Sequence, residues 1–578
     1  SRGIFLKECF EEVSELQKKV VIGKQDFESL RQNDYFYIDK TEFIRDWWDS
    51  GDDVTLITRP RRFGKTLNMS MLNCFFSTEY AEGAELFKDL DIWKYEDYRH
   101  KQGKYPVIFL SFAGVKADNI RDAKFQIKMK IAELFDQNIK LLKGDVLSSN
   151  EKDIFSKINM DMDDALCSMS INLMCRFMQK YYGKKVIILL DEYDTPMQEA
   201  YIYGYWDEFT SFLRNLFNST FKSNQYMERA IMTGITRVSK ESMFSDLNNP
   251  NVITTTSNEY STAFGFTEQE VFDSLEQYGL KANKDDVKKW YDGFTFGKHK
   301  DIYNPWSIIN YLDKKQIYPY WAATSSNGLI NHLLQTASGN VKTLVEELIK
   351  GNQIVVSFDE QIVFDQLDTN ENAIWSLLVA GGYLKVEDVE YRGELREPWY
   401  HLSITNLETR SMFSGMFKDW FSGTSSSYNE FVKALLCGDI KQMNTYMNDI
   451  ALITFSNFDS GNHPSQKAQP ERFYHGFVLG LLVELRDVYE VKSNRESGYG
   501  RYDVMLIPVE RKNDNNAIVL EFKVHDPDEE KSLKETATSA LAQIEEKNYD
   551  AELIAKGITK DRIKHYGFAF EGKKVLIM

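Results

Sequence analysis

A basic turn that contains one glycine carries the most specific chemical pattern in the sequence. Residues Arg59–Thr66 read Arg-Pro-Arg-Arg-Phe-Gly-Lys-Thr, and they separate the β-branched run Val54–Thr58 from a segment with helical periodicity. The pattern that cradles nucleotide phosphates is Gly, four residues, then Gly-Lys-Ser/Thr. The last three positions match, whereas Arg59 stands where the first glycine is expected. We expect this replacement to alter the entry of the turn and to put a guanidinium beside the phosphates.

Each matching residue type has a task at a phosphate. Gly64 lets backbone N–H groups approach the oxygens, Lys65 places a positive charge at the β- and γ-phosphates, and Thr66 offers a hydroxyl to Mg²⁺. We therefore expect ATP to be held by these three residues together with Arg62 and Phe63.

An apolar run that ends in two acids supplies the residues that ATP hydrolysis needs. Residues Lys185–Leu190 are followed by Asp191 and Glu192, as in a strand buried on both faces of a parallel sheet. Asp191 is expected to hold Mg²⁺ through water, and Glu192 to polarise the attacking water. Chance matches are the alternative for each motif, and their occurrence in one α/β segment argues against that alternative.

The next expected strand, Arg229–Thr236, ends in further candidates. Thr236 or Arg237 is a candidate sensor of the γ-phosphate, although an ordinary surface arginine explains Arg237 nearly as well. Arg214 and Arg229 are further candidates for an arginine finger, and the sequence does not choose among them.

A second group of charged residues lies near the C-terminus. Asp503 begins one apolar strand, and the strand Ala517–Val524 carries Glu521 and Lys523 two residues apart, on one face. If the two strands form a hairpin, both carboxylates and the ammonium converge. Carboxylates bind Mg²⁺ or Mn²⁺, and such a metal activates water while Lys523 orients it for attack on a phosphodiester.

An exposed Glu–Lys strand edge is the frequent alternative to a nuclease site. Against it, Glu521 and Lys523 interrupt an otherwise apolar strand, and burying unpaired charge is costly unless a metal or a partner is present. Glu484 on the preceding helix and Gln543 on the following one are weaker candidates, for a further carboxylate and for a substrate contact.

Length and composition fit several globular domains. The 578 residues exceed what one core can hold, and a hydrophobic content of 43% with 27% charged residues is ordinary. A net charge of −17 argues against broad non-specific nucleic-acid binding. Residues 465–578, however, carry 18 Lys+Arg against 20 Asp+Glu, so this end is the least repelled by a polyanion.

Cysteine usage and hydropathy favour a cytoplasmic protein without a membrane partner. The five cysteines show neither zinc-ligand spacing nor a disulfide framework, and we expect Cys167 and Cys175 to be buried thiols. Apolar runs such as Val186–Leu190 are far shorter than the ~20 residues that span a bilayer. The N-terminus shows no signal-peptide pattern.

The elements around these residues alternate strand and helix, which favours a doubly wound α/β sheet. A long helical stretch is expected over about Asn119–Tyr182, and Ala373–Leu384 reads as a helix running into a strand, compatible with a winged-helix-like unit. Asn457–Pro470 is a linker candidate. The expected strands of the sheet are Val54–Thr58, Tyr105–Phe112, Lys185–Leu190 and Arg229–Thr236.

Taken in order, these motifs resemble the family of bacterial fusions between an AAA-ATPase-like module and a PD-(D/E)XK nuclease. The resemblance covers nearly the whole chain and rests on Tyr37–Thr41, Arg59–Thr66, Leu190–Asp194, Gly234–Arg237, Tyr291–Phe294, Tyr303–Trp306, Ser493–Asp503 and Glu521–Lys523. Arg59 is similar to the family form of the loop. We therefore expect an ASCE-type P-loop ATPase domain at 1–265, a helical or winged-helix-like middle at 266–456, and a restriction-endonuclease-like αβββαβ domain at 465–578.

One position departs from the related nucleases. Those of the RecB type often carry a Gln with a Tyr four residues later, whereas here Lys547 follows Gln543 at that distance and Tyr549 lies two residues beyond. This departure argues against a RecB-like substrate role for Gln543.

Functions of different classes stay open. The first is an ATP-regulated nuclease that cleaves DNA, with Glu192, Asp503, Glu521 and Lys523 as catalytic residues and Asp503 and Glu521 as ligands of Mg²⁺ or Mn²⁺. The second is a nucleotide-controlled signalling or assembly switch, forming a homo-oligomer, whose C-terminal domain only binds nucleic acid or protein. A third is a purely structural nucleotide binder.

Overall fold

The computed structural model divides the chain into two compact units. One unit comprises Ser1–Leu329 and Val355–Thr409, and the other comprises Ile330–Ile354 and Arg410–Met578. No helix in the part of the chain described combines the length and the apolar composition needed to cross a membrane. The residues that the structure describes are 17–222, 224–237, 250–322, 329–330, 333–334, 339–360, 367, 370, 372–413, 427–454, 476–482, 485, 489–497, 500–509 and 515–578.

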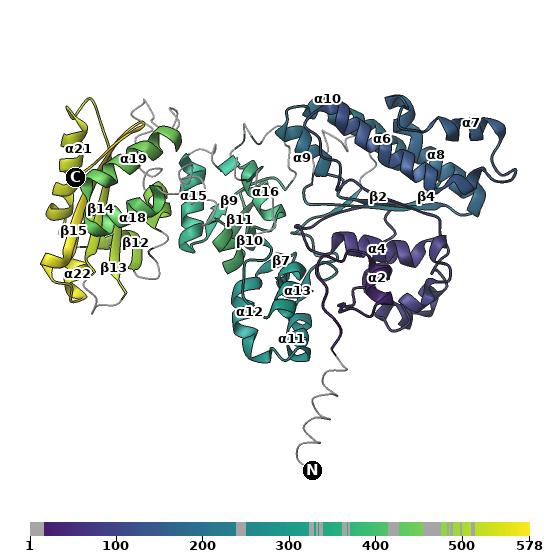
Figure 1. Cartoon of the computed structure of the whole chain (residues 1–578), viewed down its shortest axis with the longest axis horizontal. Helices are drawn as coiled ribbons and strands as arrows, with labels where there is room; N and C mark the ends of the chain where they lie inside the picture. The colour runs from purple at the N-terminus through teal and green to yellow at the C-terminus, as the bar shows by residue number, and fades with distance from the viewer. Residues whose placement is uncertain are drawn as a thin grey trace, which may run out of the picture. The chain divides into compact units, whose positions relative to one another are not determined.

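A parallel sheet of five strands forms the centre of the first unit (Figure 1). Its strands are β1 (Val54–Thr58), β2 (Val107–Ser111), β3 (Val186–Asp191), β4 (Met227–Gly234) and β5 (Asn251–Ile253). The order is β2-β3-β4-β1-β5, and every pairing is parallel. β4 therefore separates β1, which leads into the predicted phosphate loop, from β3, which ends in the acidic pair. The expected doubly wound α/β sheet is confirmed, and the strand between β1 and β3 fits the expected ASCE-type P-loop core.

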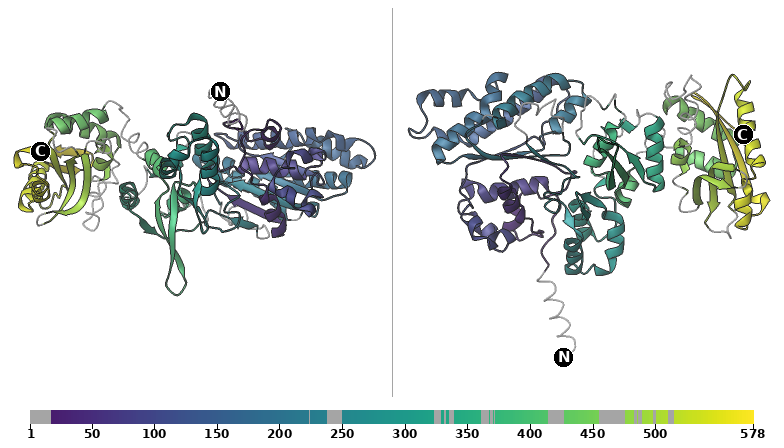
Figure 2. Two further views of the ribbon diagram at one scale, coloured as in Figure 1. Left: turned by 90° about the horizontal axis from the view of Figure 1, so that it is seen from below. Right: turned by 180° about the vertical axis from the view of Figure 1, so that it is seen from behind.

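Helices cover both faces of this sheet, as two opposite views show (Figures 1 and 2). α6, α8 and α10 lie over one face, and α2 and α4 lie over the other. Ile57, Leu189 and Ile231, from three neighbouring strands, pack into the same core as α4. The helices of this region are α2 (Phe27–Gln32), α3 (Glu42–Ser50), α4 (Lys65–Phe76), α5 (Glu96–Arg99), α6 (Ile120–Gln137), α7 (Ser149–Lys157), α8 (Asp164–Tyr182), α9 (Thr195–Ile202) and α10 (Trp206–Phe217).

The expected long helical stretch over Asn119–Tyr182 is three helices, α6 to α8, rather than one. Side chains that cap helix starts explain the breaks, because Ser148 forms a capping box with Glu151 at the start of α7 and Asp163 caps α8. Within α8, Cys167 and Cys175 are fully buried, as predicted, and burial raises the pKa of both thiols to about 12.

The middle of the chain adds a small sheet and helices to the first unit. Its strands β6 (Phe266–Thr267), β8 (His299–Tyr303) and β7 (Phe294–Phe296) pair in that order. The aromatic turns noted in the sequence supply its core, in which Tyr291, Tyr303 and Tyr311 are buried. The helices are α11 (Glu268–Gln277), α12 (Lys284–Tyr291) and α13 (Pro305–Lys314).

A helix running into a strand follows, as predicted. α16 (Ala373–Ala380) leads to β10 (Leu384–Arg392), which pairs with β11 (Glu397–Ile404) in an antiparallel hairpin. β9 (Ile354–Val356) adds to the other edge of β11. A helix followed by a hairpin is consistent with the winged-helix-like unit that we expected.

The second unit is built on a five-stranded sheet in chain order. β12, β13 and β14 are antiparallel, β14 and β15 are parallel, and β16 returns antiparallel. The parallel pair is joined by α21, which gives the βββαβ part of the expected αβββαβ fold. The elements are β12 (Tyr489–Ser497), β13 (Gly500–Pro508), β14 (Ala517–Val524), α21 (Leu533–Glu546), α22 (Asp550–Ala555), β15 (Ile563–Glu571) and β16 (Lys574–Ile577).

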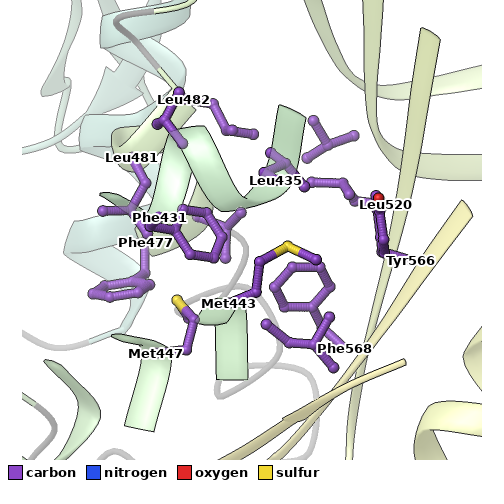
Figure 3. Packing of buried hydrophobic residues seen from close by; sticks show 14 of the residues in the cluster. Phe431, Leu435, Met443, Met447, Phe477, Leu481, Leu482, Leu520, Tyr566 and Phe568 are labelled. Atoms are coloured by element: carbon purple, nitrogen blue, oxygen red, sulfur yellow. The ribbon is translucent and has the colours of Figure 1, made fainter. Parts of the chain in front are cut away.

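Apolar side chains on the two faces of this sheet pack against different helices. On one face, residues such as Leu520 and Phe568 pack with Phe431 and Met443, which belong to α18 (Ser427–Cys437) and α19 (Ile440–Thr454) (Figure 3). On the other face, Met505 and Val519 pack against α21 and α22.

The structure groups the chain differently from the three expected segments. α18 and α19 fall within the expected middle region at 266–456, yet they contribute to the core of the C-terminal sheet. α15 (Gly339–Lys350) also belongs to the second unit. The linker candidate Asn457–Pro470 lies outside the described residues.

Candidate functional site

The predicted phosphate loop links β1 to α4 and wraps around a lysine. Two residues with positive φ shape the loop, because Arg62 has φ of 67° and Gly64, two residues later, has φ of 80°. Lys65 is only 6% exposed, and its Nζ donates hydrogen bonds of 2.8 Å to the carbonyl oxygens of Arg59 and of Pro60. Burial lowers the pKa of Lys65, and the carboxylates of the β3 end oppose this effect.

The carboxylate of Asp191 joins the loop helix to two strands. Asp191 is fully buried, and its Oδ2 accepts a 2.6 Å hydrogen bond from the Thr66 hydroxyl. Its Oδ1 accepts a 2.5 Å hydrogen bond from the hydroxyl of Thr233, near the end of β4. A hydroxyl and a carboxylate in contact at the start of a helix form a donor set suited to Mg²⁺, which prefers oxygen ligands.

Glu192 follows Asp191 in a backbone conformation that is rare for its residue type. Its φ of 52° lies in the left-handed region, which costs energy for a residue with a Cβ and recurs at functional sites. Glu192 lines the cavity at the loop, and its Oε2 accepts a 3.1 Å hydrogen bond from the Thr195 hydroxyl.

A cavity of about 500 Å³ lies against the loop. Its wall includes Lys65 and Thr66, the N-terminal segment around Tyr37, and Trp306 at the start of α13. The Arg62 guanidinium stacks on the Trp306 ring at 4.2 Å. The volume of the cavity is in the range of small-molecule sites. The sequence did not predict that the N-terminal segment and α13 would form part of its wall.

The buried side chain of Phe63 and the backbone carbonyl of Arg61 anchor the loop to the middle region. Phe63 is fully buried and packs edge-on against Phe294 at 4.7 Å. The carbonyl oxygen of Arg61 accepts hydrogen bonds from Asn304 Nδ2 at 3.4 Å and from Trp321 Nε1 at 3.1 Å. The aromatic motifs of the middle region thus contact the loop directly.

The expectation that Arg59 lies beside the phosphates is wrong. Its side chain is fully buried, and the guanidinium donates to the carbonyl oxygens of Thr58, Thr254 and Glu259. It stacks on Phe296 at 4.6 Å. Burial lowers the pKa of Arg59 to about 9. The arginine therefore braces the loop from behind, where a first glycine has no side chain to do so.

The residues at the end of β4 contact a second buried carboxylate, that of Asp194. Asp194 is 1% exposed, and its Oδ2 accepts hydrogen bonds from Thr236 N at 2.8 Å, from the Thr236 hydroxyl at 2.7 Å and from Ile235 N at 3.1 Å. A Cβ on Gly234 would lie 2.6 Å from Asp194 Oδ1, so the approach requires glycine. Thr236, a candidate sensor, therefore contacts Asp194, whereas Thr233 contacts Asp191.

The three arginines considered as γ-phosphate sensor or arginine finger do not lie together at the cavity. Arg237 is partly exposed and is not among the described residues that line the cavity. Arg229 sits early in β4, where it donates to the carbonyl oxygens of Trp47 and Trp48 and stacks on the Trp48 ring at 4.2 Å. It is a packing residue at the end of the sheet away from the loop. Arg214 lies on α10, and it too is not among the residues that line the cavity.

The C-terminal carboxylates face α21 from two neighbouring strands. β13 and β14 form the expected hairpin, with Val504 opposite Leu520. Asp503 Oδ2 accepts a 2.7 Å hydrogen bond from Phe522 N, and the charges of Asp503 and Glu521 both act on the hydroxyl of Tyr549. The two carboxylates therefore converge, as the hairpin predicted.

Residues of α21 complete this group. Glu521 is 3% exposed, and one of its carboxylate oxygens accepts a hydrogen bond from Gln543 Nε2. Lys523 Nζ donates to Ser539 Oγ at 3.0 Å, one helical turn away from Gln543. Gln543 also contacts the Tyr549 hydroxyl at 3.3 Å, and burial raises the pKa of that hydroxyl. Two carboxylates beside an ammonium fit a hard divalent cation.

Sequence reasoning missed some of these residues. Thr233, Ser539 and Tyr549 were not selected, and Gln543 was given little weight because of the departure from the Gln–Tyr spacing. Only Thr233 could have been found from the sequence, through the two-residue period of a strand. Thr233 is two residues from Ile231 and so shares its face, which is buried on the α4 side of the sheet. Glu484 lies outside the described residues.

Comparison with known proteins agrees with these two regions. Residues 21–244 match the family model described as Predicted AAA-ATPase, and residues 469–578 match that of the PD-(D/E)XK nuclease superfamily. A relative from Azotobacter chroococcum mcd 1, called an uncharacterized protein in the vnfD 5' region, is 26% identical over 560 residues, which cover 94% of this chain and 95% of the relative. The chain therefore joins an AAA-ATPase-like domain to a domain of the PD-(D/E)XK nuclease superfamily.

Proposed function

We propose that the first unit binds and hydrolyses ATP. The observation that carries this proposal is the contact of Thr66 with Asp191 beside the buried Lys65, across strand β4. Lys65 would exchange its bonds to loop carbonyls for bonds to phosphate oxygens, and Thr66 and Asp191 would hold Mg²⁺. The metal would supply charge neutralisation at the phosphates.

Glu192 is the proposed general base or water-orienting residue. Its left-handed backbone turns the side chain toward the cavity wall, where Thr195 fixes one carboxylate oxygen. Gly64, Phe63 and Arg62 would contact the nucleotide from the loop. Arg237 stays a proposed nucleotide contact.

The test of this proposal is ATP turnover in matched variants. Glu192→Gln should lower kcat by 100-fold or more (on the order of 10² for a lost catalytic base) while nucleotide binding is retained. Glu82→Gln, at an exposed position of the same unit, is the control and should turn over ATP normally. Equal turnover in both variants would contradict the assignment of Glu192.

We propose further that the second unit cleaves DNA phosphodiester bonds with Mg²⁺ or Mn²⁺. Asp503 and Glu521 would hold the cation, which supplies an activated water. Lys523 would orient that water or stabilise the developing charge. The near-balanced charge of residues 465–578 supports a polyanionic substrate.

Cleavage assays separate this activity from binding alone. Single- and double-stranded DNA, and RNA as the other polymer, are incubated with Mg²⁺ or Mn²⁺, with and without ATP. Glu521→Gln should abolish cleavage, whereas Glu529→Gln, exposed in the turn after β14, should leave it intact. Cleavage that survives Glu521→Gln, or that needs no divalent metal, would contradict the proposal.

A nucleotide-controlled assembly switch is the second candidate. It is favoured by the contacts of Asn304 and Trp321 with the carbonyl of Arg61, because they tie the loop to the middle region. The net charge of −17 also suits a protein partner better than a nucleic acid. Light scattering with ADP and with a non-hydrolysable ATP analogue tests it, and a molecular mass independent of nucleotide counts against the switch.

A further inference from the structure

Three carboxylates from separate elements of the first unit gather away from the nucleotide cavity. Glu268 begins α11, Asp292 caps the end of α12, and Asp301 lies in β8. One oxygen atom of each lies within 4.8 Å of the oxygens of the other two. All three residues lie outside the set of described residues that line the cavity.

Within the described part of the chain, the one cation that forms ion pairs with this cluster does not balance its charges. Lys288 pairs with Glu268, and its Nζ lies 3.8 Å from Asp292 and 3.9 Å from Asp301. The Tyr303 hydroxyl donates to Glu268 at 3.3 Å. One ammonium thus faces three carboxylates, all within distances at which charges interact strongly.

Asp292 supplies a second, independent observation. The residue is 8% exposed, and its Oδ1 is buried and accepts no hydrogen bond. A buried carboxylate oxygen without a donor is costly unless a cation contacts it.

We infer that Glu268, Asp292 and Asp301 form a binding site for a hard divalent cation of the size of Ca²⁺. Oxygen ligands suit such an ion, and Ca²⁺–oxygen distances of about 2.4 Å place opposite ligands about 4.8 Å apart. The three oxygens all lie within 4.8 Å of one another, so they can share one ion at such distances. The Lys288 ammonium competes for the same carboxylates and moves aside when the ion binds.

The position of this cluster gives the ion a structural task. Asp292 is two residues from Phe294, which packs on Phe63 of the phosphate loop. Asp301 is three residues from Asn304, which donates to the Arg61 carbonyl. A cation that joins these segments would stabilise the contacts of Phe294 and Asn304 with the phosphate loop, without contacting the nucleotide.

Calorimetric titration of the full chain with CaCl₂, without nucleotide, tests the site. Both chains compared carry Asp503→Asn and Glu521→Gln, so that the C-terminal carboxylates do not contribute. Adding Asp292→Asn and Asp301→Asn should remove one bound Ca²⁺ and the Ca²⁺-dependent rise in melting temperature. The control adds Asp285→Asn and Asp286→Asn, two exposed acids on the same α12, and should keep both. Equal Ca²⁺ binding in the two chains would overturn the inference.

Two conservative variants guard against a loss of folding. Lys288→Met removes the competing ammonium and should tighten Ca²⁺ binding by roughly tenfold. Tyr303→Phe should keep the Ca²⁺ stoichiometry but lower the emission of bound Tb³⁺, because Tyr303 contacts a ligand of the ion. Unchanged or weaker Ca²⁺ binding in Lys288→Met, or Tb³⁺ emission unaffected by Tyr303→Phe, would place the ion elsewhere and contradict the site.

Discussion

Thr66 at the start of α4 donates a 2.6 Å hydrogen bond to Asp191 at the end of β3, and the strand that leads to α4, β1, is not a neighbour of β3 in the sheet. Between them runs β4, whose Thr233 contacts the other oxygen of the same carboxylate. A single acid thus aligns the start of α4 with the ends of β3 and β4. The proposed nucleotide site depends on this alignment.

Removing the Thr66 hydroxyl should selectively impair the metal-dependent part of nucleotide binding. In Thr66→Ala, the affinity for MgADP is expected to fall by about tenfold to a hundredfold, because the ion loses one oxygen ligand and Asp191 loses a donor. Affinity for ADP in EDTA should stay near that of the parent. Titration with a fluorescent ADP analogue measures both, and an equal loss with and without Mg²⁺ would contradict a role in metal binding.

Restoring the consensus glycine at position 59 should destabilise the protein. Arg59→Gly removes three hydrogen bonds to buried carbonyl oxygens and the stack on Phe296, and the expected loss is ~3 kcal/mol or more in the free energy of unfolding. Arg62→Gly is the comparison, because Arg62 has a positive φ that glycine adopts freely. Urea unfolding should show a large loss only for Arg59→Gly. Similar stability of the two variants would contradict the bracing role.

Gln543 should position the Glu521 carboxylate rather than contact substrate. Gln543→Ala is expected to weaken Mn²⁺ binding at the C-terminal site by about tenfold to a hundredfold, as the loss of groups behind metal ligands commonly does. Glu545→Ala, exposed on the same α21, should bind Mn²⁺ normally. The KM for DNA should change little. A raised KM with unchanged Mn²⁺ affinity would instead indicate a substrate contact.

Glu408 should make the stability of the first unit depend on pH. Burial raises the pKa of its carboxyl to about 7, although the Ser307 hydroxyl and the Trp321 N–H, which donate to it, lower the pKa. The folded protein then keeps a proton that the unfolded chain releases near 4.5. The free energy of unfolding should therefore fall as the pH rises from about 4.5 to about 7, by on the order of 2 kcal/mol.

Paired variants isolate this contribution of Glu408. Glu408→Gln keeps the accepting oxygen without the charge, so its melting temperature should decline less over the same pH range. Glu397→Gln, exposed on β11, should retain the parent slope. Parallel pH profiles for all three proteins would rule out a titrating Glu408.

The sequence predicts the strands of the first sheet well, because local pattern decides them. The short apolar run Lys185–Leu190 predicts a strand with two buried faces, and β3 is buried along its whole length. The direction in which the Arg59 side chain points could not be predicted from local pattern. Its acceptors Thr254 and Glu259 lie 195 and 200 residues farther along the chain, so only the tertiary fold reveals them.

The C-terminal group shows the same limit. The spacing of Glu521 and Lys523 on one strand predicted a shared face, and both side chains contact α21. The approach of Tyr549 to Gln543 was hidden, because Tyr549 lies beyond the end of α21 and returns toward the site through the turn into α22. Sequence spacing within a helix does not describe a contact made around its end.

The most direct test of two separate phosphate-chemistry sites is anomalous diffraction from crystals of the full chain with Mn²⁺ and a non-hydrolysable ATP analogue. The expected result is one manganese peak between the nucleotide phosphates, Thr66 and Asp191, and another between Asp503 and Glu521. Nucleotide density away from Lys65, or Mn²⁺ that fails to occupy the Asp503–Glu521 site at saturating concentration, would contradict it.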